Sequence, residues 1–190
     1  MRSGSPPRPS RPPPPSSSRY WSSGPASRLT TPPATDRVDA SIVVALLTGN
    51  KETDAIAAHL NRDPDAMAPA HLDAEVLSAL RGRLLGNHLT MGDLRTAAAR
   101  LAAAPIRRVP LEHPRLLLEA VRWFHNLSAH DACYAALAKE FDATLLTGDK
   151  GLADTAIRAQ IACIHVDCSN LARAPGPAGA GVADAFRKWL

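Results

Sequence analysis

Residues 128–152 constrain the fold of this chain most, because they join a helix pattern, an apolar strand and an acidic turn in one short stretch. Apolar side chains at helical spacing predict a helix over residues 129–141. The apolar run over residues 143–146 is short enough to be a buried strand, and Asp149 follows it closely. Helix, strand and acidic turn in this order make half of an α/β unit.

The same alternation of strands and helices extends over residues 37–166. Strands are expected at residues 37–38, 66–69, 106–109, 144–147 and 161–166. Helices are expected at residues 41–49, 51–61, 71–85, 90–104, 115–125, 129–141 and 149–156. This order predicts an α/β fold in which helices cover both faces of a central parallel sheet.

Residues 1–35 differ in composition from the rest of the chain, because they hold ten of the 17 prolines, nine serines, five arginines and no acidic residue. Such a segment has too little apolar surface to offset the entropy of ordering it. We therefore expect a disordered tail, or a segment upstream of a native start near Leu29 or Val38. The remainder divides into an expected globular domain, residues 36–171, and a Pro/Gly/Ala linker with a short helix, residues 172–190.

The net charge of +4 belongs to the tail rather than to the expected domain. The chain has 22 Lys and Arg against 18 Asp and Glu, and five of the basic residues are tail arginines, so the remainder carries −1. The pI near 9.3 is therefore weak support for nucleic-acid binding. Three cysteines without a C-x-x-C pair argue against a disulfide framework or a zinc site and favour a reducing cytoplasm. No run of 18 apolar residues occurs, so we expect no membrane-spanning helix.

Four carboxylates occupy positions that would meet at one edge of such a sheet. Asp39 and Asp149 each follow a strand and precede a helix, and such positions converge in a parallel sheet. Glu75 falls within the apolar stripe of its helix, and Asp131 lies on the inward side of another helix, near its start. A pair of Mg²⁺ or Mn²⁺ ions would relieve their repulsion, because both are hard cations that prefer oxygen ligands. Two such ions can activate water in phosphodiester hydrolysis.

Each acid also has a simpler structural explanation. Asp39 and Asp149 could cap helix N-termini, and Ser128-x-x-Asp131 fits a capping box. Glu75 has no capping explanation and would otherwise be a side chain that reaches solvent from a tilted helix. Capping does not explain why four acids meet at one sheet edge, so we favour the metal-site interpretation.

Four segments carry a resemblance to a known family. In order along the chain, VDASIVVALL, HLDAEVLSALR, HNLSAHDACYAALA and LLTGDKGLA resemble the acidic motifs of the PIN domain, and in particular of its VapC branch of bacterial toxin ribonucleases. The resemblance spans residues 36–166 and implies a PIN-like (flavodoxin-like) three-layer α/β/α sandwich with a central parallel sheet.

The resemblance also implies a function. It implies an Mg²⁺-dependent endoribonuclease, with Mn²⁺ as the alternative ion, that acts as the toxin of a toxin–antitoxin pair. Homodimerisation, an RNA substrate and inhibition by a cognate VapB-type antitoxin are implied as well. By motif match, the catalytic and metal-binding residues would be Asp39, Glu75, Asp131 and Asp149.

Three further residues are candidates for supporting this site. Thr147 occupies the Ser/Thr position often found just before the last acid of the family. Ser41 could hydrogen-bond near the metal site and Asn126 could contact its edge, although both residue types are ordinary where they stand. We expect His130 to face away from its acidic helix neighbour, and we expect Phe124 in the core.

Two other functions compete with this interpretation. The segment GDKGLAD resembles the last acidic motif of haloacid-dehalogenase-type phosphohydrolases, whose first motif requires a second Asp where this chain has Ser41. The other is a catalytically inactive PIN-like binding module, against which the presence of all four acids counts. Cleavage of RNA in Mg²⁺ that stops with EDTA would separate the three.

Overall fold

The structure is a computed structural model that describes residues 36–49, 52–63, 65–112 and 114–168. The expectations for the tail, residues 1–35, and for the linker and short helix, residues 172–190, lie outside the described residues. The strands are β1 (Asp36–Val38), β2 (Met67–Pro69), β3 (Arg107–Val109), β4 (Thr144–Thr147) and β5 (Cys163–His165). The helices are α1 (Ala40–Thr48), α2 (Thr53–Leu60), α3 (Leu72–Leu85), α4 (Met91–Ala103), α5 (Pro114–Val121), α6 (Ala129–Glu140) and α7 (Lys150–Arg158).

The strands form one five-stranded sheet in the order β3-β2-β1-β4-β5, and every pairing is parallel. The chain moves outward from β1 to β2 and β3, then crosses back to place β4 on the other side of β1. The strand order therefore reverses at β1, and the carboxyl ends of β1 and β4 lie side by side. The predicted parallel sheet is confirmed, and this reversal is where open α/β sheets bind ligands.

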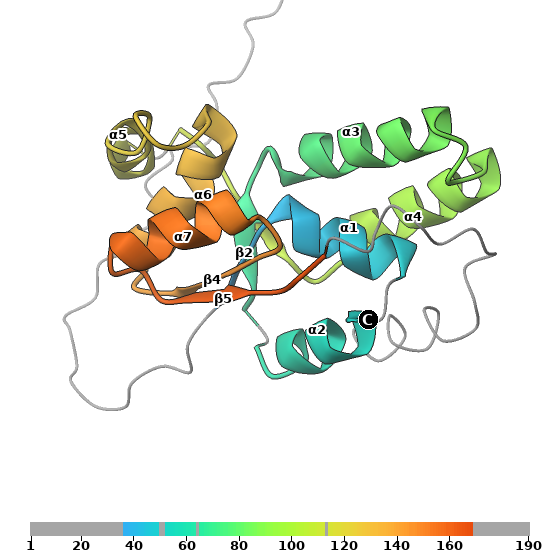
Figure 1. The fold of residues 1–190 in the computed structure, drawn as a ribbon, viewed down its shortest axis with the longest axis horizontal. Helices are drawn as coiled ribbons and strands as arrows, with labels where there is room; N and C mark the ends of the chain where they lie inside the picture. The colour runs from blue at the N-terminus through green and yellow to red at the C-terminus, as the bar shows by residue number, and fades with distance from the viewer. Residues whose placement is uncertain (1–35, 50–51, 64, 113, 169–190) are drawn as a thin grey trace, which may run out of the picture. The chain divides into compact units, whose positions relative to one another are not determined.

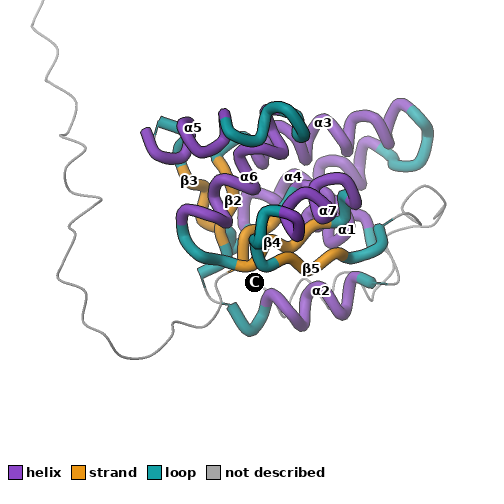
Figure 2. The backbone as a smooth tube through the Cα atoms, turned by 60° about the vertical axis from the view of Figure 1, so that its left-hand side comes forward, coloured by secondary structure: helices purple, strands orange, loops and turns teal. Residues whose placement is uncertain are grey.

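Two groups of helices cover the sheet, as predicted. Helix α6 packs against β1, β2 and β4 and contacts α5 and α7, whereas α1 packs against β4 and contacts α2, α3 and α4. Figures 1 and 2 show the strands between these helix layers. The arrangement is the PIN-like α/β/α sandwich expected from the sequence.

Helix α1 is the centre of the larger hydrophobic core. Its buried side chains follow one another without interruption from residue 42 to residue 47. A helix that is apolar on every side must be enclosed, and α1 lies between the sheet and three other helices. It ends at Gly49, whose φ of 72° lies in the left-handed region that glycine adopts without strain. This buried position fixes the residue that precedes α1, Asp39, relative to the sheet.

Helix α5 differs from its prediction. It ends at Val121, and turns occupy the rest of the range expected to be helical, up to residue 125. Leu116 and Ala120 are its buried residues, whereas Leu117, Leu118, Val121 and, in the following turn, Phe124 are all exposed. The expectation that Phe124 belongs to the core is therefore wrong. The apolar pattern correctly predicted a helix here. Its apolar residues, however, cover more of the helix surface than the face that packs on α6.

A buried arginine occupies the middle of β1, two residues before Asp39. Arg37 in β1 is fully enclosed, and its guanidinium lies over the Phe141 ring, 4.9 Å from the centroid. Burial and, to a lesser degree, the nearby charge of Arg107 lower the pKa of Arg37 to about 10, although neighbouring aspartates oppose the shift. Asp36 and Asp63 are buried beside it, and the Asp36 N–H donates to the Asp63 carboxylate. Arg37 is thus buried within reach of the charges of these aspartates, and it donates to the Asp36 carbonyl at 3.2 Å.

No helix within the described residues is long and apolar enough to cross a membrane.

Candidate active site

Asp39 lies where β1 ends and α1 begins, and its carboxylate is almost fully buried, with 5% of the residue exposed. Its extended backbone (φ −78°, ψ 156°) places it at the N-cap position of α1, but its side chain does not cap the helix. Instead, Asp39 Oδ2 accepts from Ser41 Oγ at 2.5 Å and from Thr147 Oγ1 at 2.7 Å. The capping explanation therefore does not apply to Asp39, and two predicted supporting residues, Ser41 and Thr147, contact it.

The same two hydroxyls also hold the loop that follows β4. Gly148 N–H donates to Ser41 Oγ at 2.8 Å, and Asp149 N–H donates to Thr147 Oγ1 at 2.9 Å. A side chain at Gly148 would collide with its surroundings, because an added Cβ would lie 2.7 Å from Cys168 Sγ. The hydroxyls thus connect the ends of β1 and β4 at the point where the strand order reverses.

The environment of Asp39 opposes its ionisation. Burial raises the pKa of Asp39, hydrogen bonds from Ser41 and Thr147 lower it, and the negative charge of Glu75 raises it; the pKa lies above its ordinary value. Glu75 therefore lies near enough to Asp39 for their charges to interact. Bringing a cation to this pair would relieve both the burial of a charge and the like-charge repulsion.

Glu75 lies in the first turn of α3 and is held from three directions. Tyr134 Oη donates to Glu75 Oε2 at 2.7 Å, His71 Nε2 lies 3.4 Å from the same oxygen, and His130 Nδ1 lies 3.7 Å from Oε1. His71 Nε2 makes no well-aligned hydrogen bond, so Tyr134 is the better-formed donor. Burial raises the pKa of Glu75, but its contacts with His71 and Tyr134 and the charges of both histidines outweigh burial, and the pKa lies below its ordinary value.

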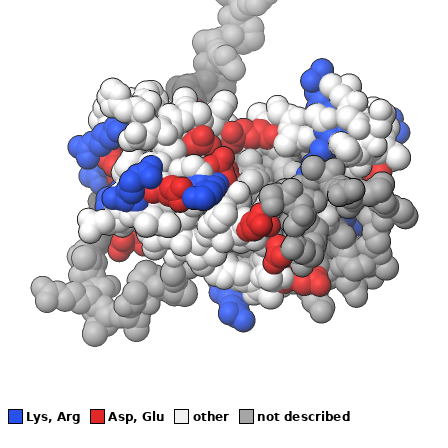
Figure 3. Space-filling model, in the orientation of Figure 1, with Lys and Arg blue, Asp and Glu red and all other residues white. Residues whose placement is uncertain are grey.

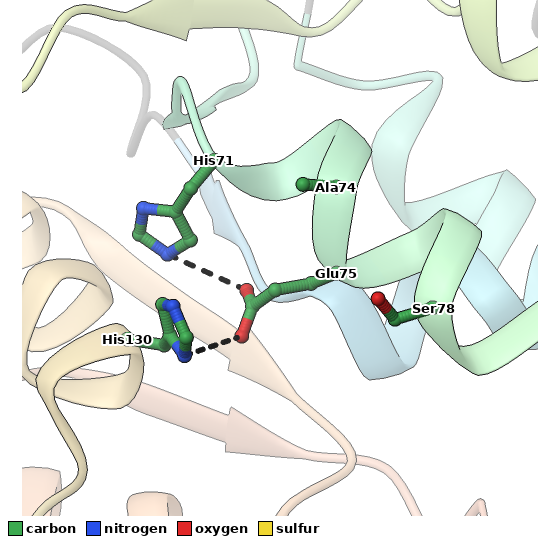
Figure 4. A pocket seen from close by; sticks show the side chains of 5 residues that line it. All are labelled: His71, Ala74, Glu75, Ser78 and His130. Carbon is green, nitrogen blue, oxygen red and sulfur yellow. Dashed lines mark ion pairs between the residues drawn. The ribbon is translucent and has the colours of Figure 1, made fainter.

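An open hollow of about 330 Å³ lies beside Glu75. His71, Ala74, Glu75, Ser78 and His130 line it, and Figure 4 shows both histidine rings on one side of the Glu75 carboxylate, each facing one of its oxygens. In Figure 3 acidic side chains reach the surface where the start of α3 approaches α6. The acidic groups thus extend from the buried Asp39 to the partly exposed Glu75 near the surface.

Asp149 makes the capping contact that the simpler explanation predicts, whereas the predicted Ser128–Asp131 capping box forms only in part. The Ser128 hydroxyl caps α6, but the Asp131 carboxylate accepts from that hydroxyl and not from the Ser128 N–H. Ser128 Oγ donates to Asp131 Oδ2 at 2.7 Å and accepts from the Asp131 N–H at 3.2 Å. Asp149 Oδ1 accepts from the Leu152 N–H at 2.8 Å. Each carboxylate uses one oxygen in these contacts, so the contacts do not by themselves prevent it from binding a cation through the other oxygen.

The structure brings some of the predicted site residues into contact and leaves others apart. Asp39, Ser41 and Thr147 are in direct contact, and Glu75 interacts with Asp39 through its charge. No group of three or more His, Cys, Asp or Glu side chains in the described residues is close enough to hold a metal ion with the side chains as they stand. Asn126 is an exposed turn residue whose N–H donates to the Trp123 carbonyl at 2.9 Å, and no hydrogen bond of the described residues joins it to the acids.

Residues 38–158 match the sequence profile of the PIN domain, and this segment contains all four predicted acids. This chain belongs to the PIN domain family. The resemblance inferred from the acidic motifs is confirmed, and the haloacid-dehalogenase interpretation is left without support.

Curated relatives place the PIN domain in the VapC group. Ribonuclease VapC1 of Mycobacterium tuberculosis is 37% identical over 116 residues, which cover 61% of this chain and 86% of that protein. Ribonuclease VapC3 of the same organism is 40% identical over 129 residues, covering 65% and 89%. Ribonuclease VapC12, also from that organism, is 30% identical over 118 residues, covering 62% and 89%.

The donor chemistry of this PIN domain fits a hard divalent cation, although the side chains as they stand do not form a complete ligand shell. The candidates at the strand ends are carboxylates, whose oxygens such cations prefer. Asp39 is the strongest of them, because its carboxylate is buried and has a raised pKa beside the charge of Glu75. The fit therefore rests on the Asp39–Glu75 pair, with Asp131 and Asp149 as further oxygen donors.

Sequence reasoning missed three residues that contact Glu75. His71 stands four positions before Glu75, a helical spacing that brings two side chains together and could have been noticed. His130 was expected to face away from Asp131, which leaves its partner open, and its ring lies near Glu75 of α3. Tyr134 is one of the side chains whose helical spacing predicts α6, and the partner of its hydroxyl could not be foreseen because α3 supplies it.

Proposed function

We propose that this chain is a divalent-metal-dependent endoribonuclease and the toxic component of a toxin–antitoxin pair. The curated relatives, named as ribonucleases of the VapC group, support the reaction class. One observation in the structure carries the proposal: the buried Asp39 carboxylate is fixed by Ser41 and Thr147 at the carboxyl ends of β1 and β4, beside the charge of Glu75. Buried like charges of this kind favour the binding of a cation.

Four carboxylates would hold the ion, namely Asp39, Glu75, Asp131 and Asp149. We propose Mg²⁺, with Mn²⁺ as the alternative, because both prefer oxygen ligands. A bound divalent ion supplies activation of water and stabilisation of the leaving oxygen. The hydroxyls of Ser41 and Thr147 keep Asp39 in one orientation, so that its carboxylate does not have to reorganise during the reaction.

The test is cleavage of RNA by the purified full chain in Mg²⁺, with and without EDTA. Asp39→Asn should abolish cleavage, because it removes the buried negative charge while it keeps the side-chain shape. Asp154→Asn is the matched control, because Asp154 is an exposed carboxylate paired with Lys150 at 2.7 Å, and this variant should cleave like the wild type. Cleavage by Asp39→Asn at the wild-type rate, or cleavage that persists in EDTA, would contradict the proposal. Hydrolysis of small phosphate esters in place of RNA would favour a phosphohydrolase.

The toxin role has its own test. A VapB-type antitoxin that places an Arg or Lys side chain near Asp39 would pair with carboxylates that otherwise bind metal. Its inhibition should therefore weaken as the Mg²⁺ concentration rises. Expression of the wild-type chain should arrest growth, Asp39→Asn should not, and co-expression of the antitoxin should restore growth. Equal growth of wild type and Asp39→Asn at equal protein levels would argue against a toxin.

We also propose a homodimer. Exposed apolar side chains gather on and just after α5, and contiguous apolar surface of this kind is typical of protein interfaces. They are Leu117, Leu118, Val121 and Phe124. We call this set the α5 apolar surface.

A further inference from the structure

Tyr134 is a buried polar residue whose side chain joins two helices. It lies within α6, is fully enclosed, and its Oη donates to Glu75 Oε2 on α3 at 2.7 Å. A buried hydroxyl without a partner is destabilising, so this hydrogen bond satisfies the phenol. It also fixes one oxygen of a carboxylate that would otherwise sample several rotamers.

The hydroxyl of Tyr134 lies among the groups that define the acidic site. Burial raises the pKa of Tyr134, and so do the hydrogen bond to Glu75 and the negative charges of Glu75 and Asp39, while the Ala40 backbone N–H acts against them. The phenol is therefore near the start of α1 as well as near α3. It remains protonated at neutral pH and serves as a permanent donor.

The two histidines complete the surroundings of the Glu75 carboxylate. The His71 ring meets the Tyr134 ring edge-on, with centroids 5.2 Å apart, and lies 5.1 Å from the His130 ring. His71 is mostly enclosed, whereas His130 is largely open to solvent. Figure 4 shows both rings on the side of Glu75 away from Ser78. Tyr134 is thus the partner that reaches Glu75 from within the core, where packing holds it most firmly.

We propose that Tyr134 is a positioning residue, whose hydroxyl orients the Glu75 carboxylate toward Asp39 and thereby sets the affinity of the acidic site for a divalent cation. The inference rests on the proposed metal-dependent function. Groups that hydrogen-bond to metal-binding carboxylates fix the orientation of those carboxylates, and their removal commonly weakens metal binding by about 10-fold to 100-fold.

The first measurement is the direct binding of Mn²⁺ to the full chain. Binding is detected as a loss of the electron paramagnetic resonance signal of the free ion. Tyr134→Phe removes one oxygen atom and should lower Mn²⁺ affinity by about tenfold. The Mg²⁺ concentration for half-maximal RNA cleavage should rise by a similar factor, while the rate at saturating Mg²⁺ changes little. Leu137→Val is the control, because Leu137 is buried one turn further along α6, and this variant should lower the melting temperature without changing Mn²⁺ affinity.

A double-mutant cycle separates positioning from a purely structural role. Glu75→Gln alone should weaken Mn²⁺ binding, and adding Tyr134→Phe to it should have almost no further effect, because Tyr134 acts through Glu75. If Tyr134→Phe does not fold, Tyr134→Met lacks the same donor and serves in its place.

Wild-type Mn²⁺ affinity in a folded Tyr134→Phe protein would overturn the inference, and so would independent, additive losses in the double mutant. A wild-type chain that binds no Mn²⁺ would overturn it as well. A wild type that binds Mn²⁺ but does not cleave RNA would instead overturn the proposed ribonuclease function. The double-mutant cycle on Mn²⁺ affinity would still decide the role of Tyr134.

Discussion

At Asp39, burial and hydrogen bonding act in opposite directions on one carboxylate. Burial and the charge of Glu75 raise its pKa, whereas the hydroxyls of Ser41 and Thr147 lower it. The raised pKa means that the native state holds a proton on Asp39 more tightly than the unfolded chain does. Ionised Asp39 therefore lowers the stability of the metal-free protein at neutral pH.

Asp39→Asn should accordingly raise the melting temperature of the metal-free protein at pH 7, by about 3 °C for a gain of about 1 kcal/mol. The difference in melting temperature between the variant and the wild type should shrink as the pH falls below the raised pKa of Asp39, because the Asp39 side chain of the wild type then becomes neutral as well. It should be smallest near the unfolded-state pKa of about 4. Thermal unfolding in EDTA at several pH values measures this, with Asp154→Asn as the control. A lower melting temperature for Asp39→Asn at pH 7 would show that its hydrogen bonds outweigh its burial.

Gly148 gives a second prediction for a single residue. Gly148→Ala should destabilise the protein by about 1–3 kcal/mol, because the added methyl group would lie 2.7 Å from Cys168 Sγ in a packed site. The loop that binds Ser41 should also shift and slow RNA cleavage. Gly82→Ala is the matched control, since nothing lies within 4 Å of an added Cβ in the exposed part of α3, and it should stabilise by about 0.5–1 kcal/mol. Urea unfolding distinguishes the two, and equal effects would contradict the close contact at Gly148.

Among the elements, α4 shows a helix whose start is specified locally. Thr90 Oγ1 accepts from the Asp93 N–H at 3.1 Å, and Asp93 Oδ2 accepts from the Thr90 N–H at 2.9 Å. The two bonds form a capping box, whose sequence signature is a Thr followed three residues later by an acid. Thr90 and Asp93 are near neighbours in the chain, so this contact requires no knowledge of the rest of the fold.

Thr90→Ala should therefore destabilise the protein by about 1 kcal/mol, because it leaves a helix N–H without its cap. Thr96 lies one turn inside the same helix, and its hydroxyl donates to the Gly92 carbonyl at 3.0 Å. Thr96→Ala should change stability by no more than about 0.5 kcal/mol, since alanine is favoured in helices. Chemical denaturation of both variants measures the contrast. Equal losses would mean that the box contributes nothing beyond an ordinary surface contact.

At the scale of the whole molecule, the α5 apolar surface is a set of hydrophobic side chains that the fold leaves exposed to solvent. Helix α5 packs on α6 through Leu116 and Ala120, and the same helix directs Leu118, with 71% of its surface exposed, to solvent. Covering this surface with a second copy of the chain would remove it from water without altering the core. The proposed homodimer is consistent with this arrangement.

Leu118→Lys should convert the dimer to a monomer, because a charge would be buried in an apolar interface. Size-exclusion chromatography with light scattering measures the mass. Ile157→Lys is the control, since Ile157 is also an exposed apolar residue, with 60% of its surface exposed, but lies on α7. It should leave the mass unchanged. A wild-type monomer, or a dimer that persists in Leu118→Lys, would contradict an interface at α5.

The sequence by itself determined the secondary-structure elements and the parallel arrangement of the strands. Hydrophobic periodicity depends on near neighbours in the chain, so it located every described strand and helix. Parallel topology then predicted Asp39 and Asp149 at one sheet edge, and the structure joins Asp39 to Thr147, two residues before Asp149. Their spacing along the chain allowed this inference because parallel strands end at the same edge.

Only the tertiary structure decided which side chains meet across elements. It placed Tyr134 and His130 against Glu75, buried Arg37 against Phe141, and left Leu118 exposed. Each of these depends on how one helix is rotated and tilted against another element. Helical periodicity shows that a residue lies on an apolar stripe, but not which partner meets it or how much of the stripe is covered. Those quantities follow from the packing of the whole molecule.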